Sequence, residues 1–242
     1  MLQSISAEWL KLRRSRILLL LAVLPVVSLV IGGSNYYFNR QALQDGWYSL
    51  WTQASLFYGE FFLPILIAIC CSYVCRLEHV NRNWNMVLTA PVSASSVYFA
   101  KWGMVSLFIL FAQTLFVALY WLTGLQFSIP GPLPGEIIEW AVRGWYASLS
   151  IIALQLGLSI RMRSFATPIG ICLCAVFVGL GLYVANLGMF FPFSLLTIGM
   201  GVLSQTGLTG MQNVLFFVLN LLFILVFSGM TIRRLKHKDI AF

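Results

Sequence analysis

Charged side chains are scarce in this sequence. Only 9% of its 242 residues are Asp, Glu, Lys or Arg, whereas 60% are hydrophobic. An average soluble domain has about a quarter of its residues charged. The 15 basic and 7 acidic side chains are too few to cover the polar surface of a soluble protein of this length. The composition therefore excludes a soluble globular protein and indicates an integral membrane protein.

Catalytic and cofactor-binding motifs are also missing. The sequence has no GxxxxGK[ST] phosphate-binding loop, no nucleophile elbow and no HExxH motif, and its two histidines, His79 and His237, are far apart. The five cysteines form no CxxC pair. We therefore expect no catalytic residue, no metal site and no cofactor in this chain. The positive charge lies in short clusters between apolar runs, which is typical of membrane flanks rather than of nucleic-acid binding.

Long apolar runs divide the chain into six candidate membrane spans. A spanning helix needs about 20 mostly apolar residues, and the clusters of proline and glycine at 130–135 exclude a helix there. The sequence predicts an all-α polytopic membrane protein with a single domain, residues 1–242. We expect spans at about 17–38, 55–75, 102–123, 138–160, 166–185 and 211–231.

The stretch between the fifth and sixth spans needs a separate explanation. No charged side chain occurs in the 69 residues from Ser164 to Ile232, and two spans use only about 40 of them. Residues 186–210 are too apolar for a hydrated loop, so we expect short re-entrant or external helices there, packed against protein or water. The alternative is a seventh span at 189–204, which would place the basic C-terminus outside.

The distribution of basic residues predicts the orientation. With six spans, thirteen Lys and Arg residues fall on one side of the membrane and only Arg40 and Arg143 on the other. Basic residues favour the cytoplasmic side. We therefore expect both termini in the cytoplasm, in a bacterial cell membrane.

Acidic side chains near the outer face are candidates for substrate contact or gating. Glu60 lies inside the second span beside Tyr58, and a carboxylate at membrane depth normally faces a cavity or a partner. The alternative is that Glu60 snorkels to the headgroups. Asp45 and Glu139 give the outer face an acidic character that suits a cationic ligand, although Glu139 is also spaced to pair with Arg143.

A cytoplasmic segment after the second span has an amphipathic pattern. Apolar residues recur there at helical spacing, which predicts a short helix over 77–91 that ends at Pro91. Such a helix lies on the bilayer or docks into a groove of a partner protein. The residues expected at a docking contact are Leu77, Glu78, Val80, Arg82, Trp84, Val87 and Leu88.

Two segments together resemble a known family. A basic amphipathic segment at 8–14 precedes the first span, and the second span is followed by Glu78, Asn83-Trp84, Leu88, Pro91-Val92-Ser93, Tyr98 and Lys101. This layout resembles the permease subunits of ABC-2-type transporters and is similar to the lantibiotic-immunity permeases. The resemblance implies a coupling helix at 77–91 that meets a separate ATPase, an elbow helix at 2–15, and paired short external helices at 186–210.

The resemblance also implies a function. The chain would be the permease of an ABC transporter that expels a cationic antimicrobial peptide, a lantibiotic, from the lipid bilayer. ATP and Mg would bind to two copies of an ABC ATPase subunit, and a second permease, homologous or identical, would complete the assembly. Two alternatives stay open: an ABC-2 exporter of another drug, lipid or polymer, and a non-transporting membrane scaffold or sensor subunit.

Overall fold

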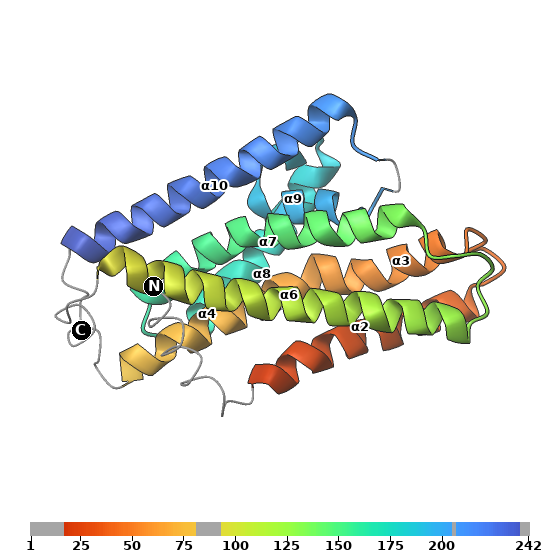
Figure 1. Cartoon of the computed structure of the whole chain (residues 1–242), viewed down its shortest axis with the longest axis horizontal. Coiled ribbons are helices and arrows are strands. Elements are labelled where there is room, and N and C mark those ends of the chain that lie inside the picture. Colours follow the sequence, from red (N-terminus) through yellow and green to blue (C-terminus); the bar gives the residue numbers. More distant parts are fainter. Residues whose placement is uncertain (1–16, 81–92, 205–206, 238–242) are drawn as a thin grey trace.

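The computed structural model describes residues 17–80, 93–204 and 207–237, apart from the side chains of Leu77, Val80 and His237. Within these ranges the chain forms helices joined by short connections, and no strands (Figure 1). The expected elbow helix at 2–15 lies outside the described residues, as does the expected coupling helix from residue 81 onward.

Among the described residues, six helices are long and apolar enough to cross a membrane. The second is continuous and has three parts, α3, the π-helix η1 and α4. The predicted all-α, six-span fold class is confirmed. The elements of these six helices are α2 (Ile17–Phe38), α3 (Trp47–Ser55), η1 (Leu56–Phe62), α4 (Leu63–Val80), α6 (Ala94–Gln126), α7 (Gly135–Arg161), α8 (Ala166–Val184) and α10 (Gly210–His237).

Two of these helices begin earlier than the sequence suggested. The second begins at Trp47 instead of about residue 55, and the third begins at Ala94 instead of about residue 102. Ser93 caps the third helix, because its Oγ accepts a hydrogen bond of 3.2 Å from the backbone N–H of Ser96. Hydropathy alone marks where polar residues become rare, but a helix includes polar first turns that can be capped or packed. As a result, Glu60 and Lys101 lie further inside their helices than expected.

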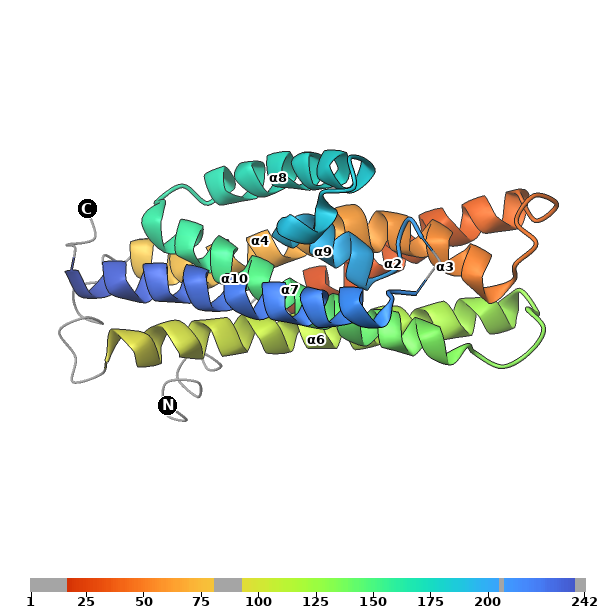
Figure 2. The ribbon, with the colours of Figure 1, turned by 90° about the horizontal axis from the view of Figure 1, so that it is seen from above.

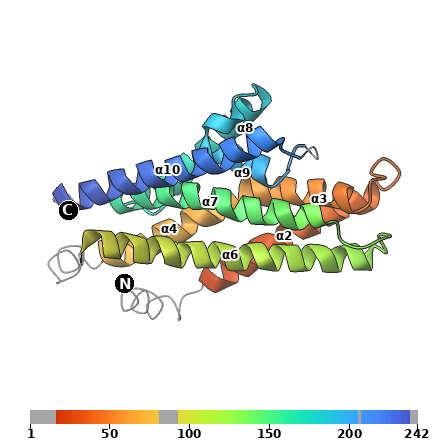
Figure 3. The same ribbon diagram turned by 45° about the horizontal axis from the view of Figure 1, so that its top comes forward.

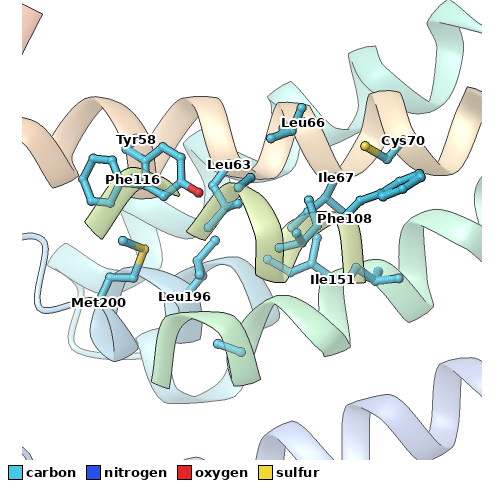
Figure 4. Close-up of a cluster of buried hydrophobic side chains, with 14 of the residues drawn as sticks. Tyr58, Leu63, Leu66, Ile67, Cys70, Phe108, Phe116, Ile151, Leu196 and Met200 are labelled. Carbon is cyan, nitrogen blue, oxygen red and sulfur yellow. The ribbon is translucent and has the colours of Figure 1, made fainter. Parts of the chain in front are cut away.

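The bundle is centred on α7, which packs against α4, α6 and α10, while α8 lies at one edge (Figure 2). Apolar side chains from several helices meet in the core, including Leu63 of α4, Phe108 of α6 and Ile151 of α7 (Figure 4). The apolar segments of α8 and α10 are only 22% and 17% buried. These two helices therefore present most of their apolar surface outward, as expected for helices in a membrane.

Basic side chains collect at one end of the bundle. α4, α7 and α10 finish at this end and α6 begins there (Figures 1 and 3). We call it the basic end, after Arg76, Arg161, Arg233 and Arg234, which lie near the ends of α4, α7 and α10. At the opposite end α2 finishes and α3 and α7 begin. The positive-inside rule predicts that the basic end faces the cytoplasm.

The connection between α8 and α10 folds back into the bundle. It contains the 3₁₀-helix η2 (Gly188–Phe190) and the helix α9 (Pro192–Gly199). Eight residues of α-helix extend only about 12 Å, so the alternative of a seventh span at 189–204 is wrong. The expected short helices are confirmed. Leu195 and Leu196 are fully buried, which shows that α9 packs against the other helices of the bundle.

Candidate functional site

The second long helix widens into a π-helix near its middle. Glu60 lies in this segment, η1, about 13 residues after the first residue of the helix, Trp47. At 1.5 Å per residue this places Glu60 about 20 Å along the helix axis. Short π-helical segments inside α-helices are frequent at functional sites. Glu60 is therefore deep in the bundle, at a point where the helix geometry is unusual.

Glu60 is buried and hydrogen-bonded to a short helix distant in the sequence. Its side chain is 4% exposed, and its Oε2 accepts a hydrogen bond of 2.6 Å from Oγ1 of Thr197 on α9. A snorkelling carboxylate would be exposed to the headgroups, so the snorkelling alternative is wrong. No Lys, Arg or His among the described residues forms an ion pair with Glu60. A buried carboxylate of this kind is costly without a cation to balance it.

A cavity of about 430 Å³ lies beside Thr197. It opens between α8, α9 and the start of α10, and Thr197 in its wall donates the hydrogen bond to Glu60. None of the described residues that line this cavity is charged, and the carboxyl group of Glu60 is connected to it through the hydrogen bond from Thr197. The polar side chains in the lining belong to Tyr183, Asn186, Thr197, Ser204 and Gln212.

Two glycines leave room for the end of α9 to pack closely against the π-helix. A Cβ atom on Gly59 would lie 2.8 Å from Sδ of Met200, and a Cβ on Gly144 of α7 would collide with the same side chain. The indole N–H of Trp51 donates a hydrogen bond of 2.9 Å to the carbonyl of Met200. Figure 4 shows Met200 beside Tyr58 in the core. This packing fixes Thr197, three residues earlier, against Glu60.

The other residues predicted to contact substrate do not join Glu60. Tyr58 faces α6 and stacks on Phe116, with ring centroids 4.0 Å apart (Figure 4). Asp45 is exposed in the connection before α3. Glu139 forms an ion pair with Arg143 on the same helix, as the alternative reading of its spacing predicted. Of the four candidates, Glu60 alone is hydrogen-bonded to a residue that lines this cavity, Thr197.

The residues expected at an ATPase contact are only partly within the described chain. Residues 77–80 continue α4 and do not begin a separate helix. Glu78 is buried, and its Oε1 lies 3.0 Å from Nζ of Lys101 on α6. The expectation that Glu78 presents its charge to a partner is therefore corrected, because its carboxylate is used inside the bundle. The remaining predicted contact residues are outside the part of the chain that the structure describes. They are the side chains of Leu77 and Val80 and the residues Arg82, Trp84, Val87 and Leu88.

Metal ligation has no support in the part of the chain that the structure describes. No group of three His, Cys, Asp or Glu side chains there could hold a metal ion. The buried cysteines are thiols packed in the core, where they act as small apolar residues. They are Cys70, Cys71, Cys75 and Cys172.

Sequence reasoning missed the positions of three residues: two near Glu60 and one at the basic end. Thr197 lies 137 positions after its partner Glu60, and Tyr183 also comes from a distant helix. Lys101 was expected in a cytoplasmic flank and is fully buried. One local indication was present: Gly59 directly precedes Glu60, and small residues in membrane helices mark places where another segment approaches closely.

Comparison with known protein families places most of the chain in a family. Residues 4–179 match the family described as ABC-2 family transporter protein. No curated protein and no solved structure matches the chain. The matched stretch covers well over half of the chain and runs from before α2 into α8. The family supplies the transmembrane component of a transporter and implies an ABC ATPase as partner. This chain belongs to the ABC-2 transporter family.

Proposed function

We propose that this chain is the permease subunit of an ABC transporter that expels a cationic antimicrobial peptide, a lantibiotic, from the bacterial cell membrane. The observation that carries the proposal is Glu60, a buried carboxylate without a basic partner in the described chain, next to a cavity with an uncharged polar lining. A lysine side chain or the terminal amine of a peptide would balance this charge. The resemblance of residues 8–14 and 78–101 to the lantibiotic-immunity permeases supports the choice of substrate.

The proposed orientation and assembly follow from charge and family. The basic end faces the cytoplasm, and both termini are cytoplasmic, because basic residues favour that side of a membrane. The cavity then lies in the outer half of the bilayer, where an amphipathic peptide first enters, so the useful movement is outward. Two ATPase copies bind ATP and Mg, and a second permease, homologous or identical, completes the pore.

Deletion of the gene tests the proposed function. We expect the deletion strain to become more sensitive to a lantibiotic made by the same strain, and the wild-type gene to restore resistance. A hydrolysis-deficient partner ATPase should give the same sensitivity as the deletion, because expulsion requires ATP. Unchanged sensitivity to every peptide that the strain makes would contradict the proposal. Resistance that persists without ATP hydrolysis would favour a scaffold or sensor, and sensitivity to an uncharged drug alone would favour another exporter.

The docking of the ATPase gives a second prediction. Replacing Trp84 by Ala is expected to cost about 2 kcal/mol at the contact and so to lower the affinity for the ATPase about thirtyfold. A large aromatic side chain is the type of residue that dominates such interfaces. Co-purification of the ATPase with the variant measures the loss, and resistance should fall in parallel.

The control for this experiment is Trp121→Ala, which removes an exposed indole from the far part of α6. The ATPase should co-purify with the control as it does with the wild type. Full ATPase recovery and full resistance in Trp84→Ala would show that the segment lies on the bilayer and does not dock.

A further inference from the structure

A buried ion pair joins the two ends of the connection between α4 and α6. Glu78 lies in the last turn of α4 and Lys101 in the second turn of α6, and their side chains are 3% and 1% exposed. Nζ of Lys101 lies 3.0 Å from Oε1 of Glu78 and donates a second hydrogen bond of 3.3 Å to the carbonyl of Val74. α4 ends two residues after Glu78, and α6 begins seven residues before Lys101.

Stability alone does not account for this pair. Burying two charges has a desolvation penalty that their attraction often fails to exceed, and apolar replacements of similar size are frequently as stable. The best-attested use of a buried ion pair is to fix the register of the elements it joins. Ionisable side chains inside membrane bundles also tend to be functional.

Further hydrogen bonds connect the same region to two more helices. The ring Nε2 of His79, adjacent to Glu78, lies 3.0 Å from the carbonyl of Ser159 on α7. The hydroxyl of Tyr98, one turn before Lys101, lies 2.9 Å from Oγ of Ser228 on α10. A displacement applied at either end of the α4–α6 connection therefore acts on α4, α6, α7 and α10 together.

We propose that the Glu78–Lys101 pair is the joint through which the partner ATPase moves the membrane helices. Glu78 and Lys101 are positioning residues: they touch neither nucleotide nor substrate, but hold the bases of α4 and α6 in one register. The proposal rests on the proposed function, because it takes the α4–α6 connection as the place where the ATPase acts. α10 contributes Gln212 to the lining of the cavity next to Thr197, so movement of α10 through this joint is expected to change the shape of that cavity.

The test uses the full permease–ATPase complex in proteoliposomes and needs no peptide. A cysteine at Gln212, an exposed residue in the cavity wall, is introduced together with Cys174→Ser, which removes the exposed native thiol. The labelling rate with a membrane-impermeant maleimide is measured without nucleotide and with ATP plus vanadate. We expect the rate to change at least about threefold with nucleotide when the ion pair is intact.

The decisive variant is the neutral double replacement Glu78→Gln with Lys101→Met, which removes both charges of the pair together. It should retain its melting temperature, its bound ATPase and basal ATP hydrolysis within about twofold, but lose the nucleotide-dependent change in labelling. The charge-swapped pair, Glu78→Lys with Lys101→Glu, should restore that change. Lys236→Met, which removes an exposed cation at the end of α10, is the matched control and should respond like the wild type.

Three results would contradict the proposal. The neutral variant could keep the full nucleotide-dependent change in labelling rate, or the charge-swapped variant could fold and yet lack this change. The wild-type labelling rate could also be the same with and without nucleotide. A merely structural role would instead lower the melting temperature and leave the response of the folded fraction intact. Failure of the peptide proposal is a different result, because it shows in resistance assays and not in nucleotide-dependent labelling.

Discussion

Replacing Glu60 by Gln is expected to lower the transport of a cationic peptide about 10- to 100-fold. The amide keeps the shape of the side chain and its carbonyl still accepts the hydrogen bond from Thr197, so the fold should be retained. What is lost is the charge beside the cavity. A hydrogen bond to a charged group contributes about 1.5–3 kcal/mol, which corresponds to this range of affinity.

The measurement compares a fluorescent cationic peptide with its lysine-acetylated analogue in proteoliposomes that contain the permease and its ATPase. The variant should transport the acetylated analogue at nearly the wild-type rate. Glu136→Gln is the matched control, because Glu136 is an exposed carboxylate at the start of α7 that accepts a hydrogen bond from the hydroxyl of Tyr48. Equal losses for the charged and the acetylated peptide would show that Glu60 does not recognise the positive charge.

Replacing Gly32 by Ala is expected to destabilise the protein by about 3 kcal/mol or more. A Cβ at this position would lie 2.5 Å from Cα and 2.7 Å from the backbone nitrogen of Ala54, where α2 crosses α3. Backbone atoms cannot rotate away as a side chain can, so the two helices would have to separate. Separation would also break the hydrogen bond of 2.8 Å from Oγ of Ser28 to the carbonyl of Ala54. Forced overpacking of a core costs about 1–3 kcal/mol and occasionally more.

The neighbouring glycine provides the control. A Cβ on Gly33 would lie 3.5 Å from Cγ2 of Thr123, an ordinary contact distance, so Gly33→Ala should fold normally. Thermal unfolding in detergent, followed by size-exclusion chromatography, should show Gly32→Ala about 5–10 °C below the wild type and Gly33→Ala within about 2 °C of it. Equal melting temperatures for the two variants would mean that α2 and α3 do not pack as the structure shows.

The arrangement of spans could be predicted from the sequence because it depends on local hydropathy. Each span is a run of apolar residues long enough to cross a bilayer, and the apolar stretch at 186–210 had no other place than against the bundle. The first residues of the helices were harder to predict from the sequence. The first turns at Trp47 and Ala94 contain polar residues, and their helical state depends on caps and on packing with other helices.

The site could be predicted only in part, because half of it comes from distant segments. Glu60 stood out as a carboxylate inside an apolar span, and it does lie beside the cavity. Its partner Thr197 is one of several hydroxyl residues in a stretch without charge, and nothing local distinguishes it. The pairing of Glu78 with Lys101 was missed for a related reason. Both residues lie just outside the apolar runs that predict the spans, but the helices α4 and α6 extend past them and bring them into the bundle.

The π-helix in the second span has a consequence for how this helix can pack. In an unbroken α-helix, residues seven positions apart share a face, so the direction in which the first half points fixes the direction in which the second half points. η1 breaks that phase relation between α3, which packs against α2, and α4, which packs against α7 and α8. Residues of α3 and α4 that an unbroken helix would place on one face therefore point in different directions, so that one continuous helix can present an apolar face to α2 with its first half and to α7 and α8 with its second.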